Sequence, residues 1–215
     1  MAEAEVKDAD PAGLTGQDKG TGVIRAAGGK RAVVVTGALW KALTDSLAER
    51  LADELDTVLY SAGHAWGAEV FADFAEKVCA AEPTLYDPKN MPQDRFQREF
   101  NDYLAQHGWG RFDMREKYDL VLVELVSSAF PEMQGKGKAM TCSLMAGFFS
   151  GFFTGLTGIE LGCLEVQCAA GGAEKCTFVL AESPLTDSIH RALSKGRTFD
   201  EIVADMAGRQ GQGRK

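Results

Sequence analysis

Hydrophobic residues recur at helical spacing through the first third of the chain. Leucine occupies every fourth position from Leu39 onward through residues 38–58, with charged residues in between, and this spacing predicts an amphipathic helix. Thr36 stands where its hydroxyl can accept a hydrogen bond from the first turn, so it is the predicted N-cap. The apolar pattern continues from Tyr60 to Lys77, where Gly63 and Gly67 indicate either close packing or a break between two helices.

The middle of the chain combines a predicted helix with two predicted strands. Apolar side chains line one side of Asp94–His107, and Gly108 ends that helix. Trp109–Met114 and Tyr118–Val126 are predicted strands on either side of a polar turn. The segment Ser127–Lys138 contains one proline and two glycines and is predicted to be a loop.

An uncharged stretch and a hairpin follow. Ala139–Leu156 is a predicted helix, and Glu160–Ala169 and Lys175–Ala181 are predicted strands around a Gly-Gly turn. Ser183 is the predicted N-cap of the next helix, because the proline after it favours the first helical position. A last helix is predicted over Thr198–Met206.

The uncharged stretch raises the question of a membrane span. Residues 139–159 carry no charge over 21 positions, which is long enough to cross a bilayer. Four glycines and several hydroxyl side chains lower its hydropathy, however. Gly147, Gly151 and Gly155 recur every fourth residue, a spacing that lets membrane helices touch but equally lets a helix press onto a sheet or leave room for a ligand. We expect a buried central helix and no membrane span.

Composition narrows the class of protein. A net charge of -8 argues against a nucleic-acid partner, which normally meets a basic surface. The first residues are acidic and lack the apolar core of a secretory signal, so we expect a cytoplasmic protein. We expect a disordered leader over 1–32, a ligand-binding domain over 33–182, two helices over 183–208 and a tail over 209–215.

Four of the five cysteines lie in one segment of the chain. An odd number in a cytoplasmic protein argues against a disulfide framework and leaves metal ligation or buried thiols. Cys142, Glu165, Cys168 and Cys176 together offer the four donors of a closed, structural zinc site. Strand alternation places Glu165 and Cys168 on opposite faces, so this set requires a bulge, and Cys163 is a rival ligand on the Glu165 face. The alternative is that the cysteines are small buried hydrophobic residues.

The segment GFFSGFFTGLTGIELGCLEVQCAAGGAEKCTF resembles the 4-vinyl-reductase-type domain family, which also supplies the sensor module of phenol-responsive transcriptional activators. The resemblance extends from about Gly108 to about Val179. In those sensors the zinc ligands follow a Cys–Glu–Cys–Cys order with separations of 23, 3 and 8 residues, and Cys142, Glu165, Cys168 and Cys176 have the same separations. The resemblance therefore implies this zinc set over one that contains Cys163.

The resemblance also implies a fold and a function. The fold is α+β, a mixed α/β unit in which helices pack on an antiparallel sheet, as in the transport-particle subunits; such units are often homodimers around an apolar cavity. The implied function is a sensor or carrier of a small aromatic or apolar ligand. The alternatives are a carrier of a tetrapyrrole such as a bacteriochlorophyll precursor, a protein associated with vinyl reduction, or a protein-assembly subunit. No nucleophile–base pair, phosphate loop or dinucleotide fingerprint is present, which argues against an enzyme.

The phenol sensors hold their ligand with a histidine and a tryptophan upstream of the zinc residues. The candidates of these types are His64, Trp66, His107 and Trp109. Each has a simpler interpretation: His64 and Trp66 as core residues of a helix, His107 at a helix C-terminus and Trp109 at a strand start.

Overall fold

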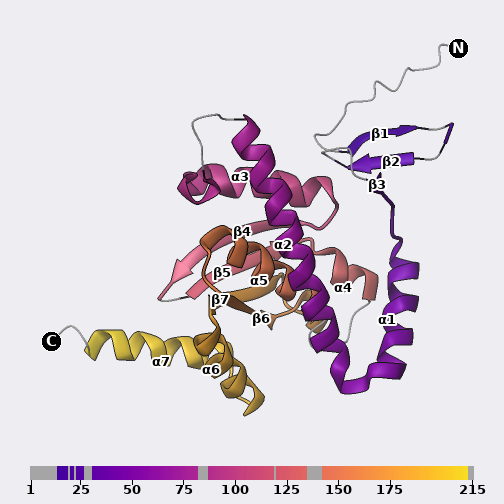
Figure 1. Ribbon diagram of the computed structural model, residues 1–215. Helices are drawn as coiled ribbons and strands as arrows, with labels where there is room; N and C mark the ends of the chain where they lie inside the picture. Colours follow the sequence, from indigo (N-terminus) through magenta and orange to yellow (C-terminus); the bar gives the residue numbers. More distant parts are fainter. Residues whose placement is uncertain are drawn as a thin grey trace, which may run out of the picture.

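The computed structural model describes residues 14–18, 20–21, 23–26, 31–81, 87–118, 120–134 and 142–212 (Figure 1). Within these residues the strands form two separate antiparallel sheets, one of three strands and one of four. Helices pack on the four-stranded sheet, which confirms the predicted α+β class.

The four-stranded sheet is the centre of the domain. Its strand order is β4-β5-β7-β6, and every neighbouring pair is antiparallel. The strands are β4 (Arg111–Lys117), β5 (Leu120–Val126), β6 (Leu161–Gln167) and β7 (Cys176–Glu182). Both predicted hairpins are confirmed, with the first turn lying between Lys117 and Leu120 rather than three residues earlier.

The inner face of the sheet is covered by α5 (Ser143–Thr157), and α2 (Leu55–Ala81) packs across α5. Nine consecutive residues of α5, from Met145 to Phe153, are buried, so the prediction of a buried central helix is confirmed. Gly158 ends this helix in the left-handed conformation. The first residues of the predicted helix, from Ala139 to Thr141, lie outside the described residues. None of the described helices is long and apolar enough to cross a membrane.

Glycine makes the contact between α2 and α5 possible. A Cβ atom on Gly63 would lie 2.0 Å from the carbonyl oxygen of Leu144, and one on Gly147 would lie 2.0 Å from that of Tyr60. The two backbones therefore touch directly. Of the two interpretations of Gly63 in the sequence, close packing is the one that the structure bears out.

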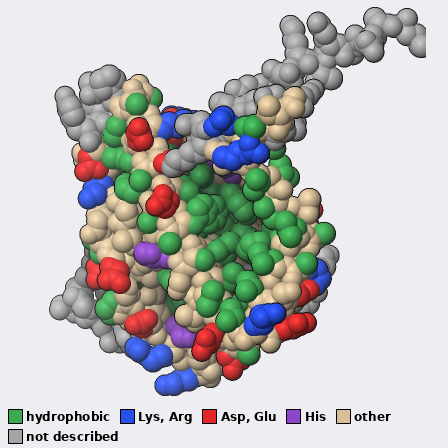
Figure 2. Space-filling model, turned by 45° about the vertical axis from the view of Figure 1, so that its right-hand side comes forward, with side chains coloured by type: hydrophobic (Ala, Val, Ile, Leu, Met, Phe, Trp, Pro, Cys, Tyr) green, Lys and Arg blue, Asp and Glu red, His purple; other side chains and the backbone are tan. Residues whose placement is uncertain are grey.

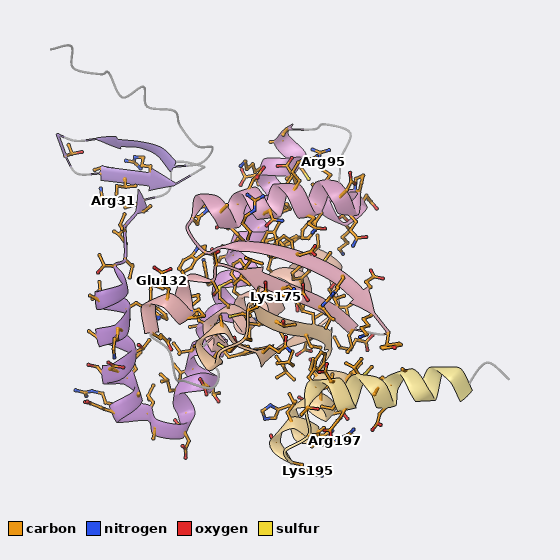
Figure 3. All side chains as sticks on the ribbon, turned by 180° about the vertical axis from the view of Figure 1, so that it is seen from behind. Arg31, Arg95, Glu132, Lys175, Lys195 and Arg197 are labelled. Atoms are coloured by element: carbon orange, nitrogen blue, oxygen red, sulfur yellow. The ribbon has the colours of Figure 1, made fainter. Side chains whose placement is uncertain are left out.

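The outer face of the sheet carries the C-terminal helices α6 (Ser183–Ser194) and α7 (Phe199–Gln212), as Figure 3 shows from behind. Strand β5 contributes side chains to both faces of the sheet. Val123 and Leu125 belong to the core beneath α5, and Leu120 and Leu122 belong to the cluster beneath α6 and α7. The prediction that Ser183 is the N-cap of α6 is wrong by one residue. Ser183 is the first helical residue and Glu182 occupies the cap, without a side-chain hydrogen bond.

The N-terminal part contains β1 (Leu14–Asp18), β2 (Val23–Ala26) and β3 (Arg31–Ala32), which pair in a small sheet within the segment expected to be a disordered leader. Helix α1 (Gly37–Leu51) follows, and Thr36 caps it as predicted. The predicted continuous helix over 38–58 is wrong, because Ala52 takes a φ of 45° and the 3₁₀ turn η2 (Ala52–Glu54) separates α1 from α2. The leucine spacing runs unchanged through this break and so could not reveal it.

Two further helices complete the domain. Helix α3 (Gln93–Gln106) matches its prediction, and Gly108 follows it with a positive φ. The prediction of a loop over residues 127–138 is wrong for α4 (Ala129–Gln134). Phe130 on this short helix is fully buried, so tertiary packing overrides the weak helical signal around its proline.

Candidate metal centre and ligand cavity

Three segments of the chain bring one carboxylate and three thiols together. Cys142 is the N-cap residue of α5, and Glu165 lies on β6. Cys168 stands between β6 and the 3₁₀ turn η4 (Ala169–Gly171), and Cys176 opens β7. One donor atom from each of the four lies within 4.8 Å of all the others, and all four residues are buried. The residues predicted from the sequence therefore meet in space.

A β-bulge removes the geometric objection to this set. The pairing of β6 with β7 shifts register between Glu165 and Gln167, where Gln167 and Glu165 face neighbouring residues of β7. The extra residue turns the chain so that Cys168 comes to the same side as Glu165. Cys163, the rival ligand, is also buried but stays outside the group, and its backbone N–H donates to the hydroxyl of Tyr60 at 3.2 Å.

Hydrogen bonds around the cluster suit anionic donors. The backbone N–H of Cys142 donates to Glu165 Oε2 at 3.1 Å, and the backbone N–H of Ala169 donates to Cys176 Sγ at 3.5 Å. The Sγ atoms of Cys142 and Cys176 lie 3.7 Å apart. Such N–H groups hold a carboxylate and a thiolate in place, as the neighbours of metal ligands commonly do.

The protonation of the cluster depends on its surroundings. Burial, followed by the hydrogen bond with Cys168, raises the pKa of Glu165 to about 8. Hydrogen bonds with Cys168 and Cys176, together with burial, raise the pKa of Cys142. The hydrogen bond from Cys142 lowers the pKa of Cys176, but contact with Cys168 and burial outweigh it and raise that pKa to about 12. The four acidic side chains lie so close together that their negative charges would repel one another. All four would therefore ionise together only around a cation.

The donor set fits a metal ion. Three sulfurs and one carboxylate oxygen, all buried and close together, match the tetrahedral ligand sets that soft divalent ions accept. The set contributes four protein donors, which fill a tetrahedral shell and leave no position for a substrate. These residues can therefore hold a metal ion.

A cavity of about 620 Å³ lies at the opposite end of α5. It is an open cavity bordered by the end of α5, the inner face of the sheet, the start of α3 and the 3₁₀ turn η3 (Pro88–Asn90). Most of its lining is apolar: Pro88, Met91, Phe96, Met114, Val121, Phe153, Leu156, Ile159, Leu161, Leu180 and Ala181. Its polar lining includes the exposed residues Lys89, Gln93, Glu116 and Glu182, so charge stands at the rim.

The four residues proposed as ligand contacts do not line this cavity. The Trp66 and Trp109 rings meet at 5.1 Å, and the Trp66 ring also lies 4.4 Å from that of Phe148, so both tryptophans belong to the core. His107 Nδ1 donates to the carbonyl oxygen of Tyr103 at 2.7 Å, at the C-terminus of α3. His64 is half-buried on α2, where its backbone faces Gly151. A role of these four residues in ligand binding stays a prediction.

Sequence reasoning missed the residues that form the cavity. Met91 lies between two prolines, Pro88 and Pro92, and Phe96, Phe153 and Leu180 are apolar residues on three separate elements. Nothing in their residue types distinguishes a cavity wall from ordinary core. Only the packing of α3 and α5 against the sheet leaves space between them.

Comparison with known proteins supports the resemblance inferred from the sequence. Residues 123–182 match the model of the 4-vinyl-reductase-type domain family, a stretch that contains all four members of the cluster. The resemblance to this domain is therefore confirmed over this part of the chain. A comparison with curated protein sequences finds no significant match.

Several solved structures resemble this chain. The phenol-responsive sensory domain of the transcription activator PoxR, solved with phenol, is 16% identical, covers 75% of this chain and 81% of its own, and superposes with a TM-score of 0.59. A vinyl-4-reductase family protein from Methanocaldococcus jannaschii is 15% identical, with 70% and 83% covered and a TM-score of 0.49. A trafficking protein particle complex subunit 3 from Naegleria fowleri, bound to palmitic acid, is 9% identical, with 67% and 93% covered and a TM-score of 0.47. At these identities the PoxR likeness establishes a common fold.

Proposed function

We propose that this protein is a binding module for a small apolar or aromatic molecule, built on a scaffold that a structural zinc ion holds together. The observation that carries the proposal is the apolar cavity of about 620 Å³ between α5, α3 and the sheet. The sensory function of the PoxR domain and the match to the 4-vinyl-reductase-type family support it. A sensor and a carrier must both first bind the ligand, and the described lining of the cavity, which is largely apolar, suits binding of an apolar molecule.

The size of the cavity indicates the size of the ligand. A cavity of about 150 Å³ is enough to hold benzene, and this one is about four times larger. Its volume lies in the range of about 300–1,000 Å³ that is typical of sites for drug-sized molecules. We therefore expect a ligand with several fused rings or a long apolar body. The same observation favours, as a second candidate, a tetrapyrrole carrier.

The polarity of the lining indicates how the ligand lies. Phe96, Phe153 and Leu180 are buried apolar walls, and the charged residues Lys89 and Glu116 are exposed at the rim. A buried polar group of the ligand would lose its water without gaining a partner at the apolar walls. We therefore expect the apolar body inside and any polar end at the mouth.

Zinc is proposed for the cluster because the donors are three thiols and one carboxylate. Cys142 would tie the start of α5 to the β6–β7 hairpin that carries the other three ligands. Bound metal would supply a charge that keeps the four acids ionised and would contribute its binding free energy to folding. Because α5 also forms the cavity wall, removal of the metal is expected to lower both the melting temperature and ligand affinity.

Ligand binding is tested by isothermal titration calorimetry with phenol, 2-naphthol and protoporphyrin IX. We expect 2-naphthol to bind more tightly than phenol, and protoporphyrin IX to bind only if the tetrapyrrole candidate is correct. Leu156→Trp fills the cavity and should abolish binding, whereas Val126→Trp, on the outer face of the sheet, should leave it unchanged. Failure of the wild-type protein to bind any of the three compounds would contradict the proposal.

The metal is tested by elemental analysis of protein purified without chelator. We expect about one zinc per chain in the wild type and in Cys163→Ala, and much less in Cys176→Ala. Cys163 is the matched control, because it is an equally buried thiol outside the cluster. Equal loss of zinc from both variants would contradict the assignment.

Several broader expectations remain part of this proposal. They are a ligand-binding domain over residues 33–182, a cytoplasmic location, and a homodimer. The four earlier candidates also remain testable: Trp109→Phe and His64→Ala should retain 2-naphthol binding if the cavity at the end of α5 is the site.

A further inference from the structure

The cavity at the end of α5 carries an uneven set of charges at its mouth, where its exposed lining residues lie. Among the described residues that line it, the charged ones are Lys89, Glu116 and Glu182, and all three are exposed. Two carboxylates and one ammonium group leave an excess of negative charge. Because the rest of the described lining is uncharged, these side chains determine which charge on a ligand the mouth favours.

The register of the sheet directs both carboxylates toward the cavity. Glu116 on β4 lies opposite Val121 on β5, which in turn lies opposite Leu180 on β7, so all three side chains share the inner face. Glu182 follows Leu180 by two positions on β7 and therefore points to the same face. One strand separates β4 from β7, which places the two glutamates about 10 Å apart across the sheet. The carboxylates therefore flank the mouth.

Neither of these carboxylates is neutralised within the part of the chain that the structure describes. There the Glu116 side chain has no ion pair or hydrogen bond, and Glu182, the N-cap residue of α6, makes no side-chain capping hydrogen bond. By contrast, Glu124 on the outer face of the same sheet forms ion pairs with Arg115 and Lys175. The charges of Glu116 and Glu182 can therefore act on a ligand.

The lysine at the mouth lies against a different negative group. Lys89 is on η3, and its Nζ would lie 3.0 Å from a Cβ atom on Gly158, the residue at which α5 ends. The C-terminus of a helix carries about half a negative charge, which an ammonium group at that position offsets. Lys89 therefore compensates the end of α5 and leaves the two glutamates uncompensated.

The neutral polar groups of the lining do not reverse this preference. The Thr157 hydroxyl donates to the carbonyl oxygen of Phe153 at 2.8 Å and accepts from the backbone N–H of Ile159 at 3.2 Å. Its proton is therefore not available to an anion. The Gln93 amide offers both a donor and an acceptor, so it favours neither sign of charge.

A second apolar region must be kept apart from this cavity in any binding experiment. Hydrophobic side chains gather in a hollow on the side of the molecule that carries α1 (Figure 2). Of the eight large hydrophobic residues exposed in the described part of the chain, six lie between residues 33 and 58, and none of these six lines the cavity. An apolar probe that adsorbed to this region would bind outside the cavity, so a variant with a filled cavity is the necessary control.

We infer that the cavity selects an apolar molecule with a cationic end, such as a primary amine on an aromatic body, over one with a carboxylate end. The apolar body lies inside, and the ammonium group lies at the mouth between Glu116 and Glu182, where it keeps part of its water. A carboxylate at the same position would be repelled by both glutamates. This inference rests on the proposed function, because it requires the cavity to be the ligand site, and it names the chemical class of the ligand.

The test is calorimetric titration of the full chain at about pH 7 with three compounds that share the naphthalene ring. They are 2-naphthylmethylamine, 2-naphthalenemethanol and 2-naphthoate, which at this pH are a cation, a neutral molecule and an anion. We expect the amine to bind at least about tenfold more tightly than the carboxylate, with the alcohol between them. Raising the salt from about 0.05 M to about 0.5 M should reduce the difference.

Variants of exposed residues assign the preference to individual charges. Glu116→Gln with Glu182→Gln should bring the amine and the alcohol to within about twofold of each other and leave the affinity for the alcohol unchanged. Lys89→Gln should weaken binding of the carboxylate further. Glu174→Gln, which removes an exposed acid outside the cavity lining, is the matched control and should keep the wild-type preference. Leu156→Trp should abolish binding of all three compounds.

The outcomes separate this inference from the proposed function. A carboxylate that binds the wild type as tightly as the amine would overturn the inference, and so would a preference for the amine that survives in the double glutamine variant. In both cases binding of the alcohol would still support the proposed function. Failure of all three compounds to bind, or their continued binding to Leu156→Trp, would overturn the proposed site and this inference with it.

Discussion

Replacing Gly147 by alanine tests the contact on which the domain is built. The added Cβ atom would lie 2.0 Å from the carbonyl oxygen of Tyr60, where ordinary van der Waals contact begins at 3.4 Å. The neighbour is helical backbone of α2, so it cannot rotate away as a side chain would. The two helices would have to separate locally by about 1.4 Å.

The loss in free energy of unfolding follows from the contacts between α2 and α5 that this separation would disrupt. A gap of about 0.5–1 Å already forfeits a quarter to a half of the dispersion energy between facing atoms. The contact includes the aromatic packing of Phe152 on Phe71 and Phe74, with centroids 5.6 Å apart in both pairs. Overpacking typically costs about 1–3 kcal/mol, and a backbone clash belongs at the upper end. Alanine also gains about 1 kcal/mol of helix propensity over glycine, so we expect a net loss of about 2 kcal/mol.

Two other glycines allow the predicted loss of stability to be compared with the size of the clash. A Cβ on Gly155 would meet Phe71 Cδ1 at 2.4 Å, and this ring belongs to a half-buried side chain that can shift. A Cβ on Gly208, on α7, would meet nothing within 4 Å. We therefore expect Gly155→Ala to lie between the other two, and Gly208→Ala to be neutral or to stabilise by up to about 1 kcal/mol.

The assay is urea unfolding followed by circular dichroism, with thermal melting as a second measurement. For a chain of this length about 1 kcal/mol corresponds to about 2–4 °C in melting temperature, so Gly147→Ala should melt about 4–8 °C below the wild type. A Gly147→Ala protein within 0.5 kcal/mol of the wild type (about the spread of neutral surface changes) would refute the reasoning. So would a larger loss at Gly155 than at Gly147.

Three other predictions concern single polar groups. Asn101→Ala removes two hydrogen bonds that the Asn101 amide makes to the backbone of Phe112 on the edge strand β4, at 2.7 and 2.8 Å, and should cost about 2 kcal/mol in urea unfolding. Tyr60→Phe leaves a backbone N–H of β6 without its acceptor and should cost about 1–2 kcal/mol, with zinc content unchanged as the control. A backbone N–H just before α7 holds the pKa of Glu201 below its ordinary value. The stabilisation from Glu201 is therefore complete above about pH 4.5 and disappears as pH falls through the lowered pKa. The measurement is amide exchange of α7 at about pH 3 and about pH 6, on the two sides of that range. Equal protection of α7 at both pH values would count against the prediction.

Much of the candidate metal centre could be predicted because its information is local. Cys168 and Cys176 flank a short turn, and a hairpin brings the ends of its strands together whatever the rest of the chain does. The order and spacing of the four donors carried the resemblance that selected Glu165 over Cys163. Strand alternation by itself requires the bulge, because only an extra residue turns Cys168 toward Glu165.

The sequence by itself determined the types of the principal elements and the burial of α5, and through its family resemblance it indicated the four residues of the candidate metal cluster. These follow from the spacing of apolar residues, from chain reversal at glycines and from residue chemistry, all of which act over short separations. Tertiary structure alone decided where α1 ends, that α4 is helical and where the cavity lies. The leucine repeat is the same on both sides of Ala52, and the cavity walls come from segments far apart in the chain. The apolar residues that border the cavity are determined by how α3, α5 and the sheet pack against one another. No local sequence pattern predicts that packing.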